Sequence, residues 1–182
     1  MSKPINFQDE RPDFATHLLQ INQHRHPISL LLDGLTLPNN IGAAFRLADA
    51  ANLQHIYFYR CSEFAQSKKW KRIARATHKY VPYTFLKTLA EIETLQISQQ
   101  LIALEWTKTS MPFRKFQPVQ PVILVLGSEQ RGVSEEVLNL AQRAIHIPMY
   151  GVNTSMNVAM AAGIVTYDLV DKVKQNDLFT NH

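Results

Sequence analysis

Residues 121–132 read PVILVLGSEQRG, an apolar run followed directly by a turn that contains two glycines. An apolar run of this length, bounded by a turn, is typical of a strand buried on both faces of a parallel sheet. Glycines directly after such a strand permit a tight turn and let backbone groups face a ligand. The turn lacks the Lys-Ser/Thr pair of a P-loop and the three-glycine spacing of a dinucleotide site, so it does not indicate a phosphate cradle.

On both sides of this stretch the sequence alternates between apolar runs and helical stretches. We expect further strands at residues 28–32, 55–59, 80–85, 101–104 and 144–147, and helices at residues 41–51, 86–95, 134–142 and 156–173. This alternation predicts an α/β fold with a mostly parallel sheet and flanking crossover helices. Residues 107–120 form the longest non-periodic stretch, and we expect a mobile connecting loop there, near a ligand.

With 182 residues, of which 46% are hydrophobic, the chain is long enough for one sizeable core and too short for two ordinary domains. We expect one domain over residues 28–182, after a polar N-terminal extension at residues 1–27 with a short helix over residues 14–21. No apolar run approaches the roughly 20 residues that span a bilayer, and the start has no signal-peptide core. The expected location is therefore cytoplasmic.

The cysteine and histidine content argues against a metal site. Cys61 is the single cysteine, which excludes an internal disulfide framework and a cysteine-based zinc cluster. Among the seven histidines, His24 and His26 lie close together, but no carboxylate stands at a matching spacing. We expect no bound metal.

The positive charge of the chain is concentrated in one segment. The formal net charge is +4, and between Glu63 and Glu91 there are basic residues but no acidic ones. If residues 67–79 are helical, four of the basic residues follow one another at steps of four, three and four and share one helix face. This basic stripe consists of Lys68, Arg72, Arg75 and Lys79. It predicts a surface that follows an RNA backbone, and the alternative is an ordinary solvated helix face.

Two further segments place polar side chains where strands end. Asn40 lies near an expected helix start with Arg46 farther along, after the strand at residues 28–32, and open parallel sheets bind ligands at such strand ends. The alternative is a capped helix with an exposed arginine. In the second segment an apolar stretch, Ile147 to Met149, precedes Ser155 and Asn157 at another helix start. There a hydroxyl and an amide either cap the helix or hold a ligand.

Taken together, the three segments resemble the motifs of the SpoU (TrmH-like) family of SPOUT RNA 2′-O-ribose methyltransferases, over about residues 28–173. The family pattern Asn-x-Gly-x-x-x-Arg is met by Asn40, Gly42 and Arg46, and Gly-x-Glu-x-x-Gly by Gly127, Glu129 and Gly132. Ile-Pro-Met followed by Ser-Leu-Asn-Val is met by residues 147–149 and 155–158. Met156 replaces the usual Leu, a volume-conserving change, and Ala159 stands where Ser is frequent.

The resemblance implies a fold with a deep C-terminal trefoil knot, which is an exception to the rule against knotted chains. It also implies that S-adenosylmethionine lies against the knotted loops. The residues expected to contact it are Leu104, Glu105, Gly127, Ile147, Met149 and Met156. An apolar slot lined by backbone groups suits recognition of its adenine.

The implied reaction transfers a methyl group to a ribose 2′-hydroxyl of RNA, and it needs help because a hydroxyl is a poor nucleophile. The family role of Arg46 is to activate this hydroxyl. An arginine is an awkward base, so we favour a role in orienting the hydroxyl and stabilising its developing charge, with base action as the alternative. The residues expected to position Arg46 and the ribose are Asn40, Glu129, Ser155 and Asn157.

The same resemblance implies a homodimer whose active sites are completed across an interface that involves the first and last helices. We expect transfer RNA as the substrate, with ribosomal RNA as the alternative. Two rival functions are a non-catalytic RNA-binding module of the same fold and a base-nitrogen methyltransferase, which would need a carboxylate base.

Overall fold

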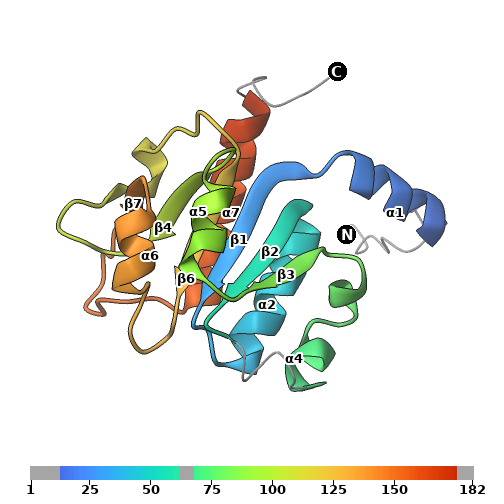
Figure 1. The fold of residues 1–182 in the computed structure, drawn as a ribbon, viewed down its shortest axis with the longest axis horizontal. Coiled ribbons are helices and arrows are strands. Elements are labelled where there is room, and N and C mark those ends of the chain that lie inside the picture. Colours follow the sequence, from blue (N-terminus) through green and yellow to red (C-terminus); the bar gives the residue numbers. More distant parts are fainter. Residues whose placement is uncertain (1–12, 62–67, 176–182) are drawn as a thin grey trace, which may run out of the picture.

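The computed structural model describes residues 13–61 and 68–175, and a sheet of seven strands crosses this part of the molecule (Figure 1). Its order is β3-β2-β1-β6-β4-β7-β5, and every neighbouring pair is parallel. The strands are β1 (His26–Asp33), β2 (Leu53–Tyr59), β3 (Tyr83–Leu86), β4 (Gln100–Leu104), β5 (Met111–Pro112), β6 (Val122–Gly127) and β7 (Arg143–His146). The predicted mostly parallel sheet is confirmed.

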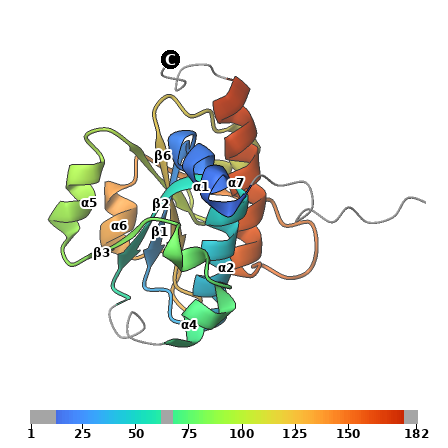
Figure 2. The same ribbon diagram turned by 90° about the vertical axis from the view of Figure 1, so that its right-hand side faces the viewer.

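Helices cover both faces of the sheet (Figure 2). Helices α2 (Pro38–Ala50) and α7 (Val158–Gln175) lie on one face, and α5 (Leu89–Leu95) and α6 (Glu135–Leu140) lie on the other. The remaining elements are α1 (Phe14–Gln23), α4 (Lys68–Ile73) and the 3-10 helices η1 (Thr77–Lys79) and η2 (Phe113–Lys115). Among the described residues, no helix combines the length and the apolar character that a membrane span requires.

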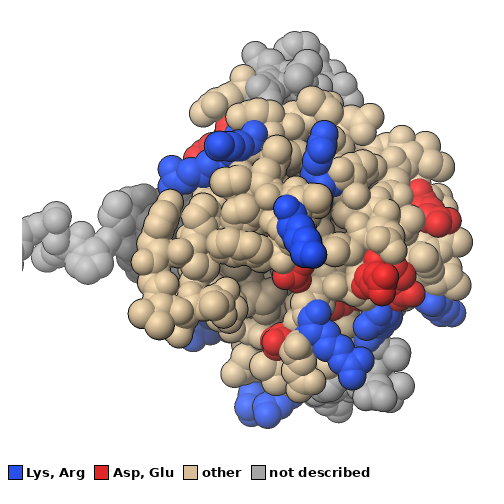
Figure 3. Space-filling model, turned by 90° about the vertical axis from the view of Figure 1, so that its left-hand side faces the viewer, with Lys and Arg blue, Asp and Glu red and all other residues tan. Residues whose placement is uncertain are grey.

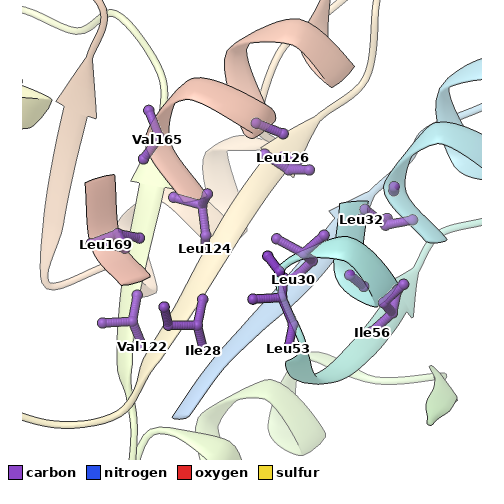
Figure 4. Packing of buried hydrophobic residues seen from close by; sticks show 14 of the residues in the cluster. Ile28, Leu30, Leu32, Leu53, Ile56, Val122, Leu124, Leu126, Val165 and Leu169 are labelled. Carbon is purple, nitrogen blue, oxygen red and sulfur yellow. The ribbon is translucent and has the colours of Figure 1, made fainter. Parts of the chain in front are cut away.

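The two central strands divide the core into two apolar layers because alternate side chains point to opposite faces. On β1, Ile28, Leu30 and Leu32 pack on the α2 and α7 side, where Figure 4 shows them with side chains of β6 and α7. Leu31 belongs to the core on the α5 and α6 side. All six residues of β6 are buried, as expected for a strand covered on both faces.

The strand order places several turns at one edge of the sheet. From β1 the chain proceeds outward through β2 and β3, whereas β6, β4 and β7 lie on the other side of β1. The carboxyl ends of β1 and β6 are in register, with Asp33 opposite Gly127. Open parallel sheets bind ligands beyond such a reversal of strand order. The segments after β1, β4, β6 and β7 all begin at this edge.

The single helix over residues 67–79 on which the basic stripe would depend is not present in the described part of this segment. Residue 67 lies outside the described residues, α4 ends at Ile73, and Arg75 and Ala76 adopt left-handed backbone conformations with φ of 47° and 68°. The chain turns because Trp70 is buried against α2, where its ring stacks on Phe45 at a centroid distance of 4.8 Å. Tertiary packing therefore overrides the local helix propensity of this segment.

The mobile loop predicted over residues 107–120 is also wrong. Residues 111–112 form β5, which pairs with β7 at the sheet edge, and Phe113 and Phe116 are buried. Lys172 of α7 donates hydrogen bonds to the backbone carbonyls of Phe113 and Arg114, each at 3.1 Å. The segment is therefore held to the core. At the start of the chain, β1 includes residues 26 and 27 of the expected extension.

Candidate functional site

Two adjoining hollows open at the carboxyl edge of the sheet. The main hollow has a volume of about 510 Å³, and a smaller side hollow has about 150 Å³. Every predicted cofactor residue lines one or both of them, as do four of the five predicted catalytic residues. These are Asn40, Leu104, Glu105, Gly127, Glu129, Ser155, Met156 and Asn157 in the main hollow, with Ile147 and Met149 in the side hollow.

A chain of hydrogen bonds joins the three sequence motifs in the main hollow. The Asn40 side chain, which is 5% exposed, donates from Nδ2 to Glu129 Oε1 at 2.8 Å. Asn157 Nδ2 donates to Asn40 Oδ1 at 3.1 Å. The buried Asn40 amide therefore has a partner for its nitrogen and another for its oxygen, and these two bonds fix its orientation.

Glu129 is the only charged member of the network, and its surroundings keep it ionised. Burial raises the pKa of this carboxyl, but hydrogen bonds from Asn40 and from backbone N–H groups, including those of Thr36 and Leu37, outweigh burial and lower it overall. Hydrogen bonds to the charged form favour that form. The main hollow therefore holds a fixed negative charge at neutral pH.

Asn157 also caps the start of the last helix, α7. Its Oδ1 accepts hydrogen bonds from the backbone N–H groups of Ala159 at 2.9 Å and Met160 at 3.2 Å. Two otherwise unpaired donors of α7 are thus satisfied, which is the ordinary work of a helix cap. Of the two uses that the sequence leaves open for this position, the structure shows the cap. Ser155 lines both hollows and has no hydrogen bond to a described residue.

The turn after β6 is closed on itself. Ser128 and Gly132 exchange two backbone hydrogen bonds of 2.9 Å, and Gly132 adopts a left-handed conformation with φ of 67°. A Cβ on Gly127 would overlap the backbone of Gly132 and Val133, so this position excludes any side chain. Glu105 Oε2 accepts a hydrogen bond from Val133 N at 2.9 Å, which ties the end of β4 to the turn.

The sequence did not predict that two carboxylates at this edge, those of Glu105 and Asp33, hold backbone N–H groups in place. The resemblance implied a cofactor contact from Glu105, whereas its carboxylate also bonds backbone N–H groups of Trp106 and Val133. Asp33, which is 1% exposed, accepts a hydrogen bond from Ser134 N at 2.6 Å and lies 3.7 Å from Arg60 Nε. A carboxylate directly after an apolar run was the available signal for Asp33.

Arg46 is the one predicted catalytic residue that does not line either hollow of its own chain. It lies on α2 with an exposed side chain, and it lines neither hollow. Among the described residues it has no hydrogen bond or ion pair. On the same helix, Gly42 faces α4, because a Cβ there would overlap the Ile73 side chain.

The basic stripe does not form a single helix face. Arg72 lies on α4, Arg75 in the following turn and Lys79 on η1, and all three are exposed. The side chain of Lys68 lies outside the described part of the structure. On the side of the molecule shown in Figure 3, Lys and Arg side chains are scattered, with acidic side chains between some of them.

The described ranges, 13–61 and 68–175, contain no group of three or more His, Cys, Asp or Glu side chains that could hold a metal ion. The main hollow combines backbone groups, an apolar lining, an amide network and the carboxylates of Glu105 and Glu129.

Comparison with known proteins adds to this geometry. Residues 27–167 match the model of the SpoU rRNA Methylase family. A tRNA (guanosine(18)-2′-O)-methyltransferase of Aquifex aeolicus is 27% identical over 162 residues, which cover 88% of this chain and 76% of the relative. The 23S rRNA (guanosine-2′-O-)-methyltransferase RlmB of Blochmanniella floridana is 27% identical over 171 residues, which cover 93% of this chain and 67% of that relative.

Solved structures agree with these relatives. The A. aeolicus TrmH/SpoU tRNA modifying enzyme superposes with a TM-score of 0.78 at 26% identity, over 92% of this chain and 87% of that one. An AdoMet-bound rRNA methyltransferase from Sinorhizobium meliloti superposes with a TM-score of 0.71 at 25% identity, over 82% of this chain and 59% of that one.

Proposed function

Because the chain belongs to the SpoU rRNA methylase family, we propose that it transfers a methyl group from S-adenosylmethionine to a ribose 2′-hydroxyl of RNA. The observation that carries this proposal is the Glu129–Asn40–Asn157 network, which joins the three family motifs in one hollow. The named relatives act at a guanosine 2′-oxygen of tRNA or 23S rRNA. A cytoplasmic location is part of the same proposal.

The two hollows fit the proposed cofactor. Leu104, Ile147, Met149 and Met156 give an apolar lining, and Gly127 has no side chain that would separate a ligand from the backbone. Such a pocket suits an adenosine group, with few polar side chains needed for orientation. S-adenosylmethionine supplies a methyl group on a positively charged sulfonium, and S-adenosylhomocysteine and a proton remain after transfer.

The residues of the network position the RNA ribose, and Arg46 acts on its 2′-oxygen. A planar guanidinium donates two parallel hydrogen bonds, so it orients the hydroxyl and stabilises the charge that develops on it. The exposed Ser155 hydroxyl and the fixed Glu129 carboxylate supply further contacts for the ribose.

Arg46 performs this role in the hollow of a second copy of the chain, so the working protein is a homodimer. Two observations support the homodimer. Arg46 is exposed, and an exposed apolar row lies on α7, the helix beside α2 (Figure 2). Met160, Ile164 and Tyr167 form this row at steps of four and three, hence on one helix face. Exposed apolar rows of this kind mark interfaces.

Mixed dimers test the exchange of Arg46. Differently tagged chains with Arg46→Ala and with Glu129→Ala, each inactive alone, should regain part of the activity when co-expressed, because one intact site then forms per dimer. Light scattering should give twice the 20.8 kDa chain mass. An active monomer, or mixed dimers with no activity, would contradict this arrangement.

Arg72, Arg75 and Lys79, with Lys68, are proposed to contact the RNA backbone. Replacing Arg72 and Arg75 with Glu should weaken RNA binding and reduce the slope of its salt dependence by about one per lost phosphate contact. S-adenosylmethionine affinity should not change. An unaltered salt slope would mean that the basic stripe is an ordinary solvated surface.

The direct test of the function uses labelled S-adenosylmethionine with separated transfer and ribosomal RNA. We expect label in the RNA, most of it in transfer RNA, at a site that resists alkaline hydrolysis because its 2′-oxygen is methylated. Binding of cofactor and RNA without transfer to either RNA would favour a non-catalytic module. Label that leaves every 2′-hydroxyl free would indicate base methylation.

A further inference from the structure

Trp106, two residues after the end of β4, has a large aromatic side chain in an exposed position. It is 58% exposed, whereas Trp70, the other of the two tryptophans, is 1% exposed in the core. The Trp106 ring stacks on the ring of His146 at a centroid distance of 4.5 Å and an interplanar angle of 23°. One face of the indole is therefore covered by the imidazole, and much of the rest faces solvent.

Hydrogen bonds hold the backbone of Trp106 and the imidazole of His146, and the indole ring is held by its stacking on that imidazole. Trp106 N donates to Glu105 Oε1 at 3.1 Å, and His146 Nδ1 shares a hydrogen bond of 2.8 Å with the Ser110 hydroxyl. Ser110 is in turn bonded to both the N–H and the carbonyl of Thr107. A ligand that stacks on a ring held in this way loses little binding energy to ordering of the protein.

The ring pair lies beside the proposed reaction site. Trp106 and His146 line the side hollow, which shares several residues with the main hollow, including Glu105, Ser155 and Met156. His146 ends β7, and Trp106 follows the end of β4, the neighbouring strand in the sheet (Figure 1). A group that lies on Trp106 is therefore close to one whose ribose occupies the main hollow.

We propose that the Trp106–His146 pair is a stacking platform for a nucleobase of the RNA adjacent to the nucleotide that is methylated. This inference rests on the proposed function. Single-stranded RNA is recognised through bases that stack on aromatic side chains, and stacking tolerates any base because each has a π-face. The exposed Lys108, two residues farther along, supplies a cation for an adjoining phosphate.

A contact that does not depend on charge is useful on this side of the molecule, because its positive charges are dispersed. The side that carries β4 and β7 faces the viewer in Figure 3, where Lys and Arg side chains are scattered rather than joined in one field. Phosphate contacts alone supply limited affinity there. A stacked base adds affinity that does not depend on charge.

Two polymers of equal charge separate stacking from phosphate binding. A short oligouridylate and an abasic oligomer of the same length carry the same phosphates, but only the first has bases. The wild-type protein should bind oligouridylate more tightly, and Trp106→Leu should weaken that binding by about 5- to 100-fold and abolish the preference. Trp106→Phe should keep most of it. Equal wild-type affinity for the two polymers would overturn the platform.

A matched control and an optical signal sharpen this test. Ile97→Ala removes another exposed apolar side chain, at the amino end of β4, and should leave oligouridylate affinity unchanged. Oligouridylate should quench the tryptophan fluorescence of the wild type, and this quenching should be lost in Trp106→Leu because Trp70 is buried. Quenching that persists in Trp106→Leu would contradict the assignment.

Failure of the platform can be told apart from failure of the proposed function. If Trp106→Leu lowers affinity for S-adenosylmethionine but not for RNA, Trp106 contacts the cofactor and the platform is wrong. If wild type and Trp106→Leu bind oligouridylate equally while the wild type methylates RNA, the platform fails and the methyl transfer stands. If oligouridylate binding behaves as expected but no RNA is methylated, the proposed function fails instead.

Discussion

Asn40 and Arg46, the two ends of one sequence motif on α2, differ in their surroundings. Asn40, at the start of the helix, is buried and hydrogen-bonded on both sides, to Glu129 and to Asn157. Arg46, six residues later, is exposed, with no hydrogen bond or ion pair to a described residue. The residues proposed to position a substrate are thus joined within one chain, whereas the proposed source of positive charge lines neither hollow of that chain.

The largest effect is expected from Arg46→Ala. Loss of one positioned donor to a developing oxyanion lowers the rate of methyl transfer by about 10²- to 10³-fold, or roughly 3 to 4 kcal/mol. Cofactor affinity and the unfolding temperature should not change, because Arg46 is exposed and lines neither hollow. Single-turnover transfer and calorimetry on the same protein check both statements.

Two further variants test whether the geometry of Arg46 matters. Arg46→Lys should restore activity only in part, since a point charge does not reproduce a planar fork. Arg143→Ala, another exposed arginine, lies at the amino end of β7 and should behave as wild type. Methyl transfer by Arg46→Ala at the wild-type rate would show that Arg46 has no catalytic role, and only Asn40 at the start of α2 would then remain a candidate site residue.

An intermediate effect is expected from Asn157, the hydrogen-bond partner of the buried Asn40. Asn157→Ala removes both the cap of α7 and the bond to Asn40, and loss of a cap costs about 1 to 2 kcal/mol of stability. Asn157→Ser keeps a capping oxygen but is too short to hold Asn40. We expect Asn157→Ser to unfold at nearly the wild-type urea concentration yet to lose methyl transfer. If Asn157→Ser is as active as the wild type, the hydrogen bond between Asn157 and Asn40 is not needed for activity.

The smallest effect is the pH dependence of Glu129. Its pKa is lowered below the usual 4.5 in the folded protein, so it contributes stability that is fully present above pH 4.5 and is lost as the pH falls through the folded value. The difference in unfolding free energy between wild type and Glu129→Gln should therefore be constant near neutral pH and shrink in acid. A difference that grows below pH 4.5 would show that burial dominates at this carboxyl.

Elements whose pattern of apolar and polar residues follows their burial were predictable from the sequence. Elements shaped by contacts with residues distant in the chain were not. The β6 run is apolar throughout because both of its faces are covered, and its length and the turn that follows it indicate a buried strand in the sequence. The break after Ile73 depends on Trp70 packing against Phe45, and no local pattern reports this contact. Residues 111–112 are too few for periodicity to mark a strand, and their pairing with β7 depends on the completed sheet.

The site divides in the same way. Asn40, Glu129 and Asn157 could be named in advance because they belong to three motifs, at strand ends and helix starts, that together resemble those of the SpoU family. The bond from Val133 N to the Glu105 carboxylate could not, since a carboxylate after a strand has many possible partners. The side to which Arg46 points follows from the packing of Gly42 against α4, which again is a tertiary contact.

The hydrogen bond between Asn157 and Asn40 joins residues 117 positions apart in the chain. Proteins are synthesised from the N-terminus, so Asn40 and Glu129 leave the ribosome before Asn157 and α7 exist. Closing so long a loop is also entropically costly, which places this contact late in folding. A nascent chain with every strand of the sheet but without α7 therefore lacks the completed pocket, and competence to recognise a ligand arises only when the last helix docks.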